Sequence, residues 1–193
     1  MRSNAFMWWQ AVLVLAGLAI IAVVFYPVSS GVPTDNARTN CQSNLKQIGL
    51  AIKQYNQDYN YKFPPVNLGK QGWADMLQPY LKNTQLFQCP KANSKHPDGK
   101  IDYFYNARVA GQAEEKFEYI ANTIMTGDGI ADAPSNANLT TFPAAWVTEE
   151  KSPAWRHLEG ANYGFADGHV KWLKPTSVSN EKASSTVNTF APW

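Results

Sequence analysis

Two histidines and an aspartate with possible chemical roles lie close together in the segment RHLEGANYGFADGHVKW, residues 156–172. His157, Asp167 and His169 could serve as zinc ligands or as an acid–base pair. A catalytic site would also need a nucleophile or a second base within reach, and the sequence nominates none. Structural hydrogen bonding of His157 to the adjoining turn is the alternative. We favour this structural role and expect no catalytic residue here.

Asp167-Gly168 is a strong signal for a two-residue β-turn, because both central positions of a type I′ turn need positive φ. Such a turn would pair Ala166 with His169. One strand face would then carry Tyr163, Phe165, Val170 and Trp172, and this face is the predicted core side. The opposite face would carry Gly164, Ala166, His169 and Lys171. The pattern therefore predicts that Asp167 serves the turn and that His169 lies on the polar side of a strand.

A second pair of carboxylates, Asp128 and Asp132, lies in the glycine-containing segment GDGIADAPSN. Oxygen ligands of this kind suit calcium. The segment is not an EF-hand loop, because apolar Ile130 stands where that loop needs an oxygen ligand and no glutamate closes the pattern. A plain surface turn is the favoured interpretation, so we predict no cofactor and keep calcium as the one candidate.

The chain has two cysteines, Cys41 and Cys89. Their spacing matches no zinc pattern, which would need two close pairs. An oxidising compartment would permit a disulfide between them. Two buried, unpaired thiols are the alternative, and the residues alone leave both open.

Composition limits the class of protein. The 193 residues suffice for one domain of ordinary size with an appendage. The net charge is +2, and no run of basic residues is interleaved with aromatic residues. We therefore expect no nucleic-acid partner.

An apolar segment without charged residues runs from Ala5 to Tyr26, long enough to cross a membrane as a helix. A cleaved signal peptide is the rival interpretation, but its apolar region is normally about 7 to 15 residues long. We therefore expect a retained, lipid-contacting anchor. Arg2 is the only charge before this segment, which favours an internal N-terminus and a globular part outside.

The region after the anchor predicts an amphipathic helix followed by strands. Apolar residues recur every three or four positions, as on one helix face: Ala37, Cys41, Leu45, Ile48, Ile52, Tyr55 and Tyr59. The helix should end near Asn60 and pack on a sheet. A second, shorter helix is expected over 73–81, and strands over 101–108 and 117–128. The pattern predicts surface loop over 128–155 and a mobile or partner-docked tail over 176–193.

These segments together resemble the bacterial pilin-like proteins that carry the prepilin-associated H-x(9)-D-G domain. The resemblance rests on ARTNCQSNLKQIGLAIKQYNQDYNYKFPP from Ala37, LFQCP from Leu86, TGDG from Thr126, and His157 followed after nine residues by Asp167-Gly168. It extends from the membrane segment to Pro175. It implies an α+β, pilin-like fold in which an N-terminal transmembrane helix precedes an amphipathic helix packed on a small antiparallel β-sheet. The implied organisation is an anchor over 1–30, a globular domain over 31–175 and a polar tail over 176–193.

The N-terminus departs from the family's pattern at one informative position. Ala5, Phe6 and Pro27 stand where a prepilin has its cleavage site, its first mature residue and its helix proline. Gln10 replaces the glutamate that normally offers a negative partner to a neighbouring subunit's amino terminus, and glutamine cannot supply that charge. The resemblance therefore implies a chain that is neither processed nor assembled in the ordinary way.

Two functional hypotheses follow, and neither involves catalysis. In the first, the chain is a single-span accessory subunit of a larger complex in the bacterial inner membrane, with its globular domain on the periplasmic or extracellular side. In the second, it is a pilin or pseudopilin that is processed and polymerises with like subunits. A terminal aromatic residue, Trp193, after a polar run suits docking to a partner and favours the first hypothesis.

Overall fold

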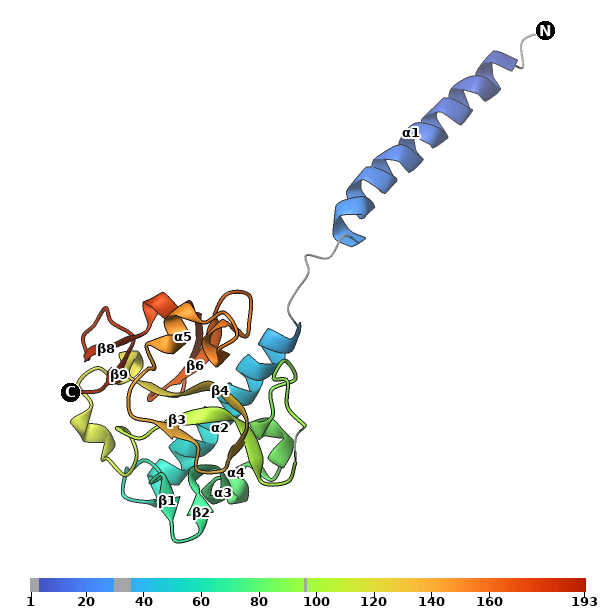
Figure 1. The fold of residues 1–193 in the computed structure, drawn as a ribbon. Coiled ribbons are helices and arrows are strands. Elements are labelled where there is room, and N and C mark those ends of the chain that lie inside the picture. Colours follow the sequence, from blue (N-terminus) through green and yellow to red (C-terminus); the bar gives the residue numbers. More distant parts are fainter. Residues whose placement is uncertain (1–3, 30–35, 96) are drawn as a thin grey trace. The chain divides into compact units, whose positions relative to one another are not determined.

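The computed structural model describes residues 4–29, 36–95 and 97–193, and the chain divides into two units, Met1–Thr34 and Asp35–Trp193 (Figure 1). The described part of the first unit is helix α1 (Asn4–Ser29). Among the described residues, no helix combines the length and the apolar character needed to cross a membrane. The predicted anchor is therefore not confirmed. The side chains of Ala5, Phe6 and Pro27 lie outside the described part of the structure, whereas Gln10 is exposed on α1.

The second unit is built on helix α2 (Asn36–Asp58), as the periodic apolar pattern predicted. The stripe from Cys41 to Tyr55 is buried, and α2 packs against strands β4, β6 and β7. Tyr59, predicted to belong to the stripe, follows the end of the helix and is 51% exposed. The expected amphipathic helix on a sheet is thus confirmed, with its end two residues earlier than predicted.

The second predicted helix, over 73–81, is divided into α3 (Trp73–Met76) and α4 (Gln78–Leu81). Pro79 explains the division, because it has no N–H to donate to the carbonyl four residues earlier. Before α3 lies a short hairpin of β1 (Asn67–Leu68) and β2 (Gln71–Gly72). After α4 follows the 3₁₀ turn η1 (Thr84–Phe87), which leads into Cys89.

The central sheet has five strands in the order β5-β3-β4-β6-β7. Their bounds are β3 (Lys100–Asn106), β4 (Ile124–Pro134), β5 (Asn138–Leu139), β6 (Ala161–Phe165) and β7 (Val170–Leu173). All neighbours are antiparallel except β3 and β5, which run parallel. The mixed α+β fold with a small, mostly antiparallel sheet agrees with the prediction.

The predicted strand over 117–128 is shifted along the chain. Its first part forms the 3₁₀ turn η3 (Ile120–Asn122), preceded by η2 (Glu114–Lys116), and β4 continues to Pro134. The predicted surface loop over 128–155 is therefore wrong. It contains the end of β4, β5, helix α5 (Ala145–Thr148) and η4 (Pro153–Trp155), and it buries Phe142, Trp146 and Ala154 in a second core cluster. The segment was predicted as a surface loop because most of its residues are small or polar, and these three buried apolar residues are isolated among them.

The hairpin of β6 and β7 differs from the prediction by one residue. Gly164 pairs with Val170, and the Phe165 amide donates to the His169 carbonyl at 2.9 Å. The loop therefore has three residues, with Gly168 alone at positive φ (+89°) and its amide bonded to the Phe165 carbonyl at 2.8 Å. A turn followed by a left-handed glycine is the common three-residue hairpin, and Asp-Gly suits it as well as the two-residue form.

This one-residue difference reverses the predicted faces, because side chains alternate along a strand. His169 stacks on the Phe165 ring at 4.3 Å between centroids, and the Lys171 ammonium lies 5.0 Å from the same ring. The predicted grouping of Val170 and Trp172 with Phe165 is wrong, since those two residues pair with Gly164 and Asn162 instead. His169 thus covers a buried aromatic ring.

The segment predicted as a mobile or partner-docked tail is instead part of the fold. After η5 (Pro175–Ser177), strands β8 (Ser179–Lys182) and β9 (Thr189–Ala191) pair in parallel. Phe190 is fully buried in the second core cluster, where its ring lies 5.3 Å from that of Phe104. The tail residue Phe190 thus packs in the core of the chain itself, whereas Trp193, the predicted docking residue, is 50% exposed.

Candidate functional site

Four side chains with metal-ligand chemistry meet in the core of the second unit. Cys41 lies on α2, Cys89 follows η1, Asp128 lies on β4, and His157 follows η4. Cys41 and Cys89 form a disulfide with a Cα–Cα distance of 5.3 Å. All four side chains are fully buried. We call this set the buried cluster.

His157 is held in the cluster by a tightly folded turn. Its amide donates to the Gly160 carbonyl at 2.8 Å, and its carbonyl accepts from the Trp172 indole at 2.7 Å. Leu158 and Glu159 both have positive φ, a conformation that costs on the order of 1–3 kcal/mol per residue and needs support from its surroundings. With the backbone fixed in this way, the imidazole Nε2 lies 3.5 Å from Cys89 Sγ and 3.5 Å from Asp128 Oδ2.

The Asp128 carboxylate has partners on both oxygens. The Asn162 backbone amide donates to Oδ2 at 2.7 Å, and the Arg156 guanidinium lies 3.4 Å from Oδ1. Arg156 also donates to the Gly129 and Asp102 carbonyls. Because a buried carboxylate is stable only when paired and hydrogen-bonded, Arg156 is the counter-charge that permits Asp128 here.

A second buried carboxylate, Asp102 on β3, fixes the loop that presents Cys89. Its Oδ2 accepts from the Cys89 amide at 2.8 Å and from the Ser94 hydroxyl at 3.1 Å, and its Oδ1 accepts from the Asp132 amide at 3.0 Å. Sequence reasoning missed Asp102 and Arg156. An available signal was the single acid within the aromatic strand IDYFY, because a charge in a buried strand needs partners.

The pKa values of two tyrosines are affected by burial and by the charge of this cluster. Burial, and after it the nearby Asp128 carboxylate, raise the pKa of Tyr103 and of Tyr163 well above the usual value for tyrosine. Both phenols therefore remain neutral at physiological pH. The cysteines also lack thiolate chemistry while they are joined as a disulfide, since the thiolate is the nucleophile and the metal ligand.

The other sequence candidates have separate partners. The Asp132 carboxylate accepts from the Lys95 backbone amide at 2.9 Å, whereas Asp128 accepts from the Asn162 backbone amide and pairs with Arg156. Asp167 accepts from the His169 amide at 3.0 Å and contacts the His169 ring at 2.5 Å. Among the described residues, the structure therefore does not bring His157 together with His169 and Asp167 in a common zinc site.

The Asp167-Gly168 turn is anchored to α2. The Lys46 ammonium donates to the Gly168 carbonyl at 2.7 Å. A side chain added at Gly49 would lie 3.6 Å from the Gly168 backbone, so helix and turn are in close contact. His157 and Asp167-Gly168 thus have different structural roles, one at the disulfide and the other at the junction of helix and hairpin.

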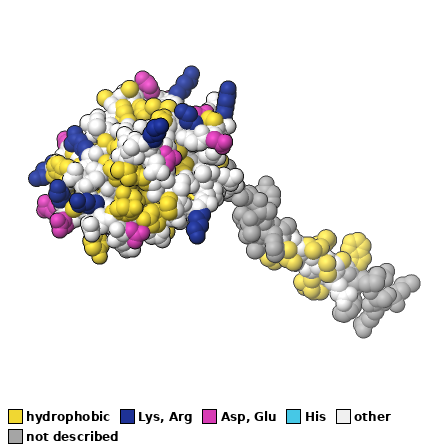
Figure 2. Space-filling model, turned by 90° about the horizontal axis from the view of Figure 1, so that it is seen from below, with side chains coloured by type: hydrophobic (Ala, Val, Ile, Leu, Met, Phe, Trp, Pro, Cys, Tyr) yellow, Lys and Arg dark blue, Asp and Glu magenta, His cyan; other side chains and the backbone are white. Residues whose placement is uncertain are grey.

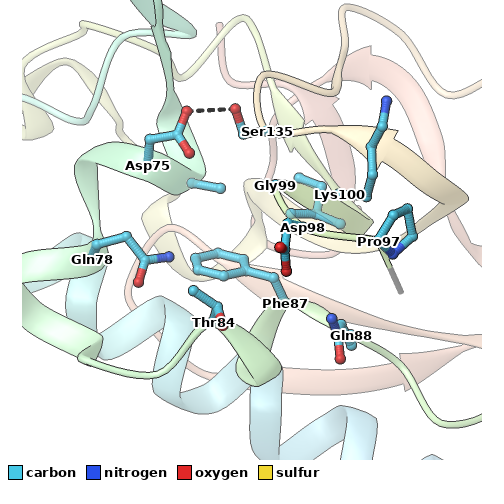
Figure 3. A pocket seen from close by; sticks show the side chains of 12 residues that line it. Asp75, Gln78, Thr84, Phe87, Gln88, Pro97, Asp98, Gly99, Lys100 and Ser135 are labelled. Carbon is cyan, nitrogen blue, oxygen red and sulfur yellow. Dashed lines mark hydrogen bonds between the residues drawn. The ribbon is translucent and has the colours of Figure 1, made fainter. Parts of the chain in front are cut away.

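A small pocket of about 290 Å³ lies between α3, η1 and the start of β3 (Figure 3). Asp75 accepts from the Ser135 hydroxyl at 2.5 Å and from the Gly72 amide at 2.8 Å. Asp98 and Lys100 are the other charged residues in the lining, which contains neither histidine nor cysteine. The volume is at the lower end of the range typical for small-molecule sites.

A family model described as "Protein of unknown function (DUF1559)" matches residues 36–88. The match begins at α2 and ends one residue before Cys89, so it includes Cys41 but not His157, Asp167 or Gly168. No curated protein and no solved structure matches the chain.

Proposed function

We propose that this chain is a pilin-like structural protein without enzymatic activity. It acts as a single-span accessory subunit of a larger complex in the bacterial inner membrane. The observation that carries the proposal is α2, whose apolar stripe is buried against an antiparallel sheet and whose residues open the family match. This arrangement is what the pilin-like resemblance implies.

Membrane attachment in this proposal rests on the apolar sequence of residues 5–26. The periplasmic or extracellular location of the globular unit is supported by the disulfide, because such bonds persist in oxidising compartments. On the face drawn in Figure 2, acidic and basic side chains of the globular unit are interspersed, with hydrophobic side chains between them. Such a surface supports a protein partner rather than nucleic acid.

Alkaline carbonate extraction of membranes tests the attachment. We expect the full chain to stay in the membrane pellet, and a variant that lacks residues 1–34 to be released. A detergent extract should then show the full chain migrating with other subunits on native electrophoresis. Release of the full chain by carbonate, or migration as an isolated monomer, would contradict the proposal.

A processed pilin or pseudopilin is the second candidate. It is favoured by the register of Ala5, Phe6 and Pro27, which matches a prepilin's. It requires a filament, for which Gln10 lacks the charge that the family's glutamate supplies. The mature N-terminus distinguishes the two candidates.

A further inference from the structure

The buried cluster has the composition of a zinc site. Two cysteines, a histidine and an aspartate supply four donor atoms that all lie within 4.8 Å of one another. Sulfur, imidazole nitrogen and carboxylate oxygen are the donors that zinc binds in proteins, and structural zinc sites have four of them. The four residues lie far apart in the sequence, so they do not form a recognisable zinc-binding sequence motif.

The distances between donors agree with tetrahedral coordination. Zinc–ligand bonds of about 2.0–2.3 Å place tetrahedral donors about 3.3–3.8 Å apart. His157 Nε2 already lies 3.5 Å from Cys89 Sγ and 3.5 Å from Asp128 Oδ2. The two sulfur atoms are closer together than this, because Cys41 Sγ is bonded to Cys89 Sγ in the disulfide.

We propose that reduction of the Cys41–Cys89 disulfide converts the buried cluster into a closed zinc site with Cys41, Cys89, Asp128 and His157 as ligands. A thiol reductant would supply two electrons by thiol–disulfide exchange, so that its own thiols are oxidised to a disulfide while each protein sulfur gains a proton. Zinc then displaces these two protons, and two zinc–thiolate bonds form. The oxidised chain keeps its sulfur–sulfur bond and offers no thiolate.

The surrounding charges suit the metal. Two thiolates and the Asp128 carboxylate carry three negative charges against two positive charges on zinc. Arg156, 3.4 Å from Asp128 Oδ1, offsets the remaining negative charge. Asp102 accepts from the Cys89 backbone amide at 2.8 Å, so the backbone of this ligand is already fixed. Outer partners of this kind orient metal ligands.

The test counts zinc in the full chain, purified in detergent, in its oxidised and reduced forms. A phosphine reductant opens the disulfide, zinc is added, unbound metal is removed, and bound zinc is measured by mass spectrometry. We expect one zinc ion for each reduced chain and none for the oxidised chain. With cobalt as the probe, the reduced chain should also show thiolate-to-cobalt charge-transfer absorption. Equal zinc in both forms, or none in the reduced form, overturns the proposal.

Matched histidine variants test the ligand set. His157→Gln should weaken zinc binding by at least about tenfold, whereas His169→Gln should not change it. Equal losses in both variants would contradict the assignment. If the reduced chain loses its fold, zinc is expected to restore the circular dichroism of the oxidised chain, because metal binding is coupled to folding. A reduced chain that remains unfolded with zinc present would also overturn the proposal.

Discussion

Asp128 carries the negative charge of the buried cluster. Its partners indicate how much stability would be lost if this charge were removed. It is fully buried, and Arg156 beside it has a side chain only 9% exposed. Removing one member of a buried ion pair leaves the other charge without compensation.

We expect Asp128→Asn to lower the free energy of unfolding by about 3–5 kcal/mol, because Arg156 would keep its charge without a counter-ion. Urea denaturation of the oxidised protein measures this change. The matched control is Glu114→Gln, which breaks the ion pair of Glu114 and Lys53. Their side chains are 28% and 24% exposed, so this variant should cost less than about 1 kcal/mol. Equal costs for the two variants would contradict the importance of burial.

Gly168 is required by its backbone conformation rather than by lack of space. Its φ is +89°, and an added Cβ would lie 3.6 Å from the Lys53 side chain, an ordinary contact. Gly168→Ala should therefore destabilise the protein by about 1–3 kcal/mol. Gly49→Ala is the control, because Gly49 lies in a helix with room for a methyl group, and alanine there should be neutral or stabilising by up to about 1 kcal/mol. Thermal unfolding of both variants would show the contrast, and a neutral Gly168→Ala would refute it.

Strand β9 contributes Phe190 to the second core cluster. Phe190→Ala should cost about 3–5 kcal/mol, since the ring is fully buried against Phe104 and Phe142. Trp193→Ala, three residues further on and 50% exposed, should cost less than about 1 kcal/mol. If the segment serves only to dock a partner, both variants will unfold like the unchanged protein in urea.

Strands β3 and β6 carry three buried tyrosines that make stability depend on pH. Burial raises the pKa of Tyr103, Tyr105 and Tyr163 in the folded chain. Below about pH 10 these tyrosines are neutral in both states, and above it the unfolded chain loses protons that the folded chain keeps. The unfolded state then binds fewer protons, so the free energy of unfolding must fall as the pH rises further.

Tyr163→Phe tests this dependence directly. The Tyr163 hydroxyl has no hydrogen-bond partner among the described residues, so the variant removes a titrating group without removing a hydrogen bond. We expect similar stability to the unchanged protein at neutral pH and a shallower fall above about pH 10. Urea unfolding across the alkaline range measures both. An identical fall in the two proteins would contradict the expectation.

Across the whole chain, local periodicity predicted the secondary structure well, whereas contacts between residues distant in the sequence could not be predicted. The stripe on α2 predicted its buried face from Cys41 to Tyr55, since helical spacing alone decides it. The Asp-Gly turn located the hairpin, but the register depends on loop length, which Asp-Gly does not specify. The burial of Phe190 in the tail was not predicted, because its partner Phe104 is far away in the sequence.

The buried cluster could not be predicted for the same reason. Cys41, Cys89, Asp128 and His157 come from separate elements, and only the sheet order brings β4 beside the turn that carries His157. The sequence identified each residue as a candidate but grouped His157 with Asp167 and His169, its neighbours in the chain. The fold instead separates the two halves of the H-x(9)-D-G motif between the disulfide and the junction with α2.

In the proposed function, this pilin-like chain remains unprocessed and serves as a membrane subunit. The mass of the N-terminal peptide of the protein, extracted from its native membranes, distinguishes an unprocessed chain from a processed one. We predict a peptide that retains Arg2 and continues through Phe6 to Gln10, because Gln10 lacks the charge used in filament assembly. A chain that begins at Phe6, and above all one methylated there, would contradict the claim and establish the processed pilin in its place.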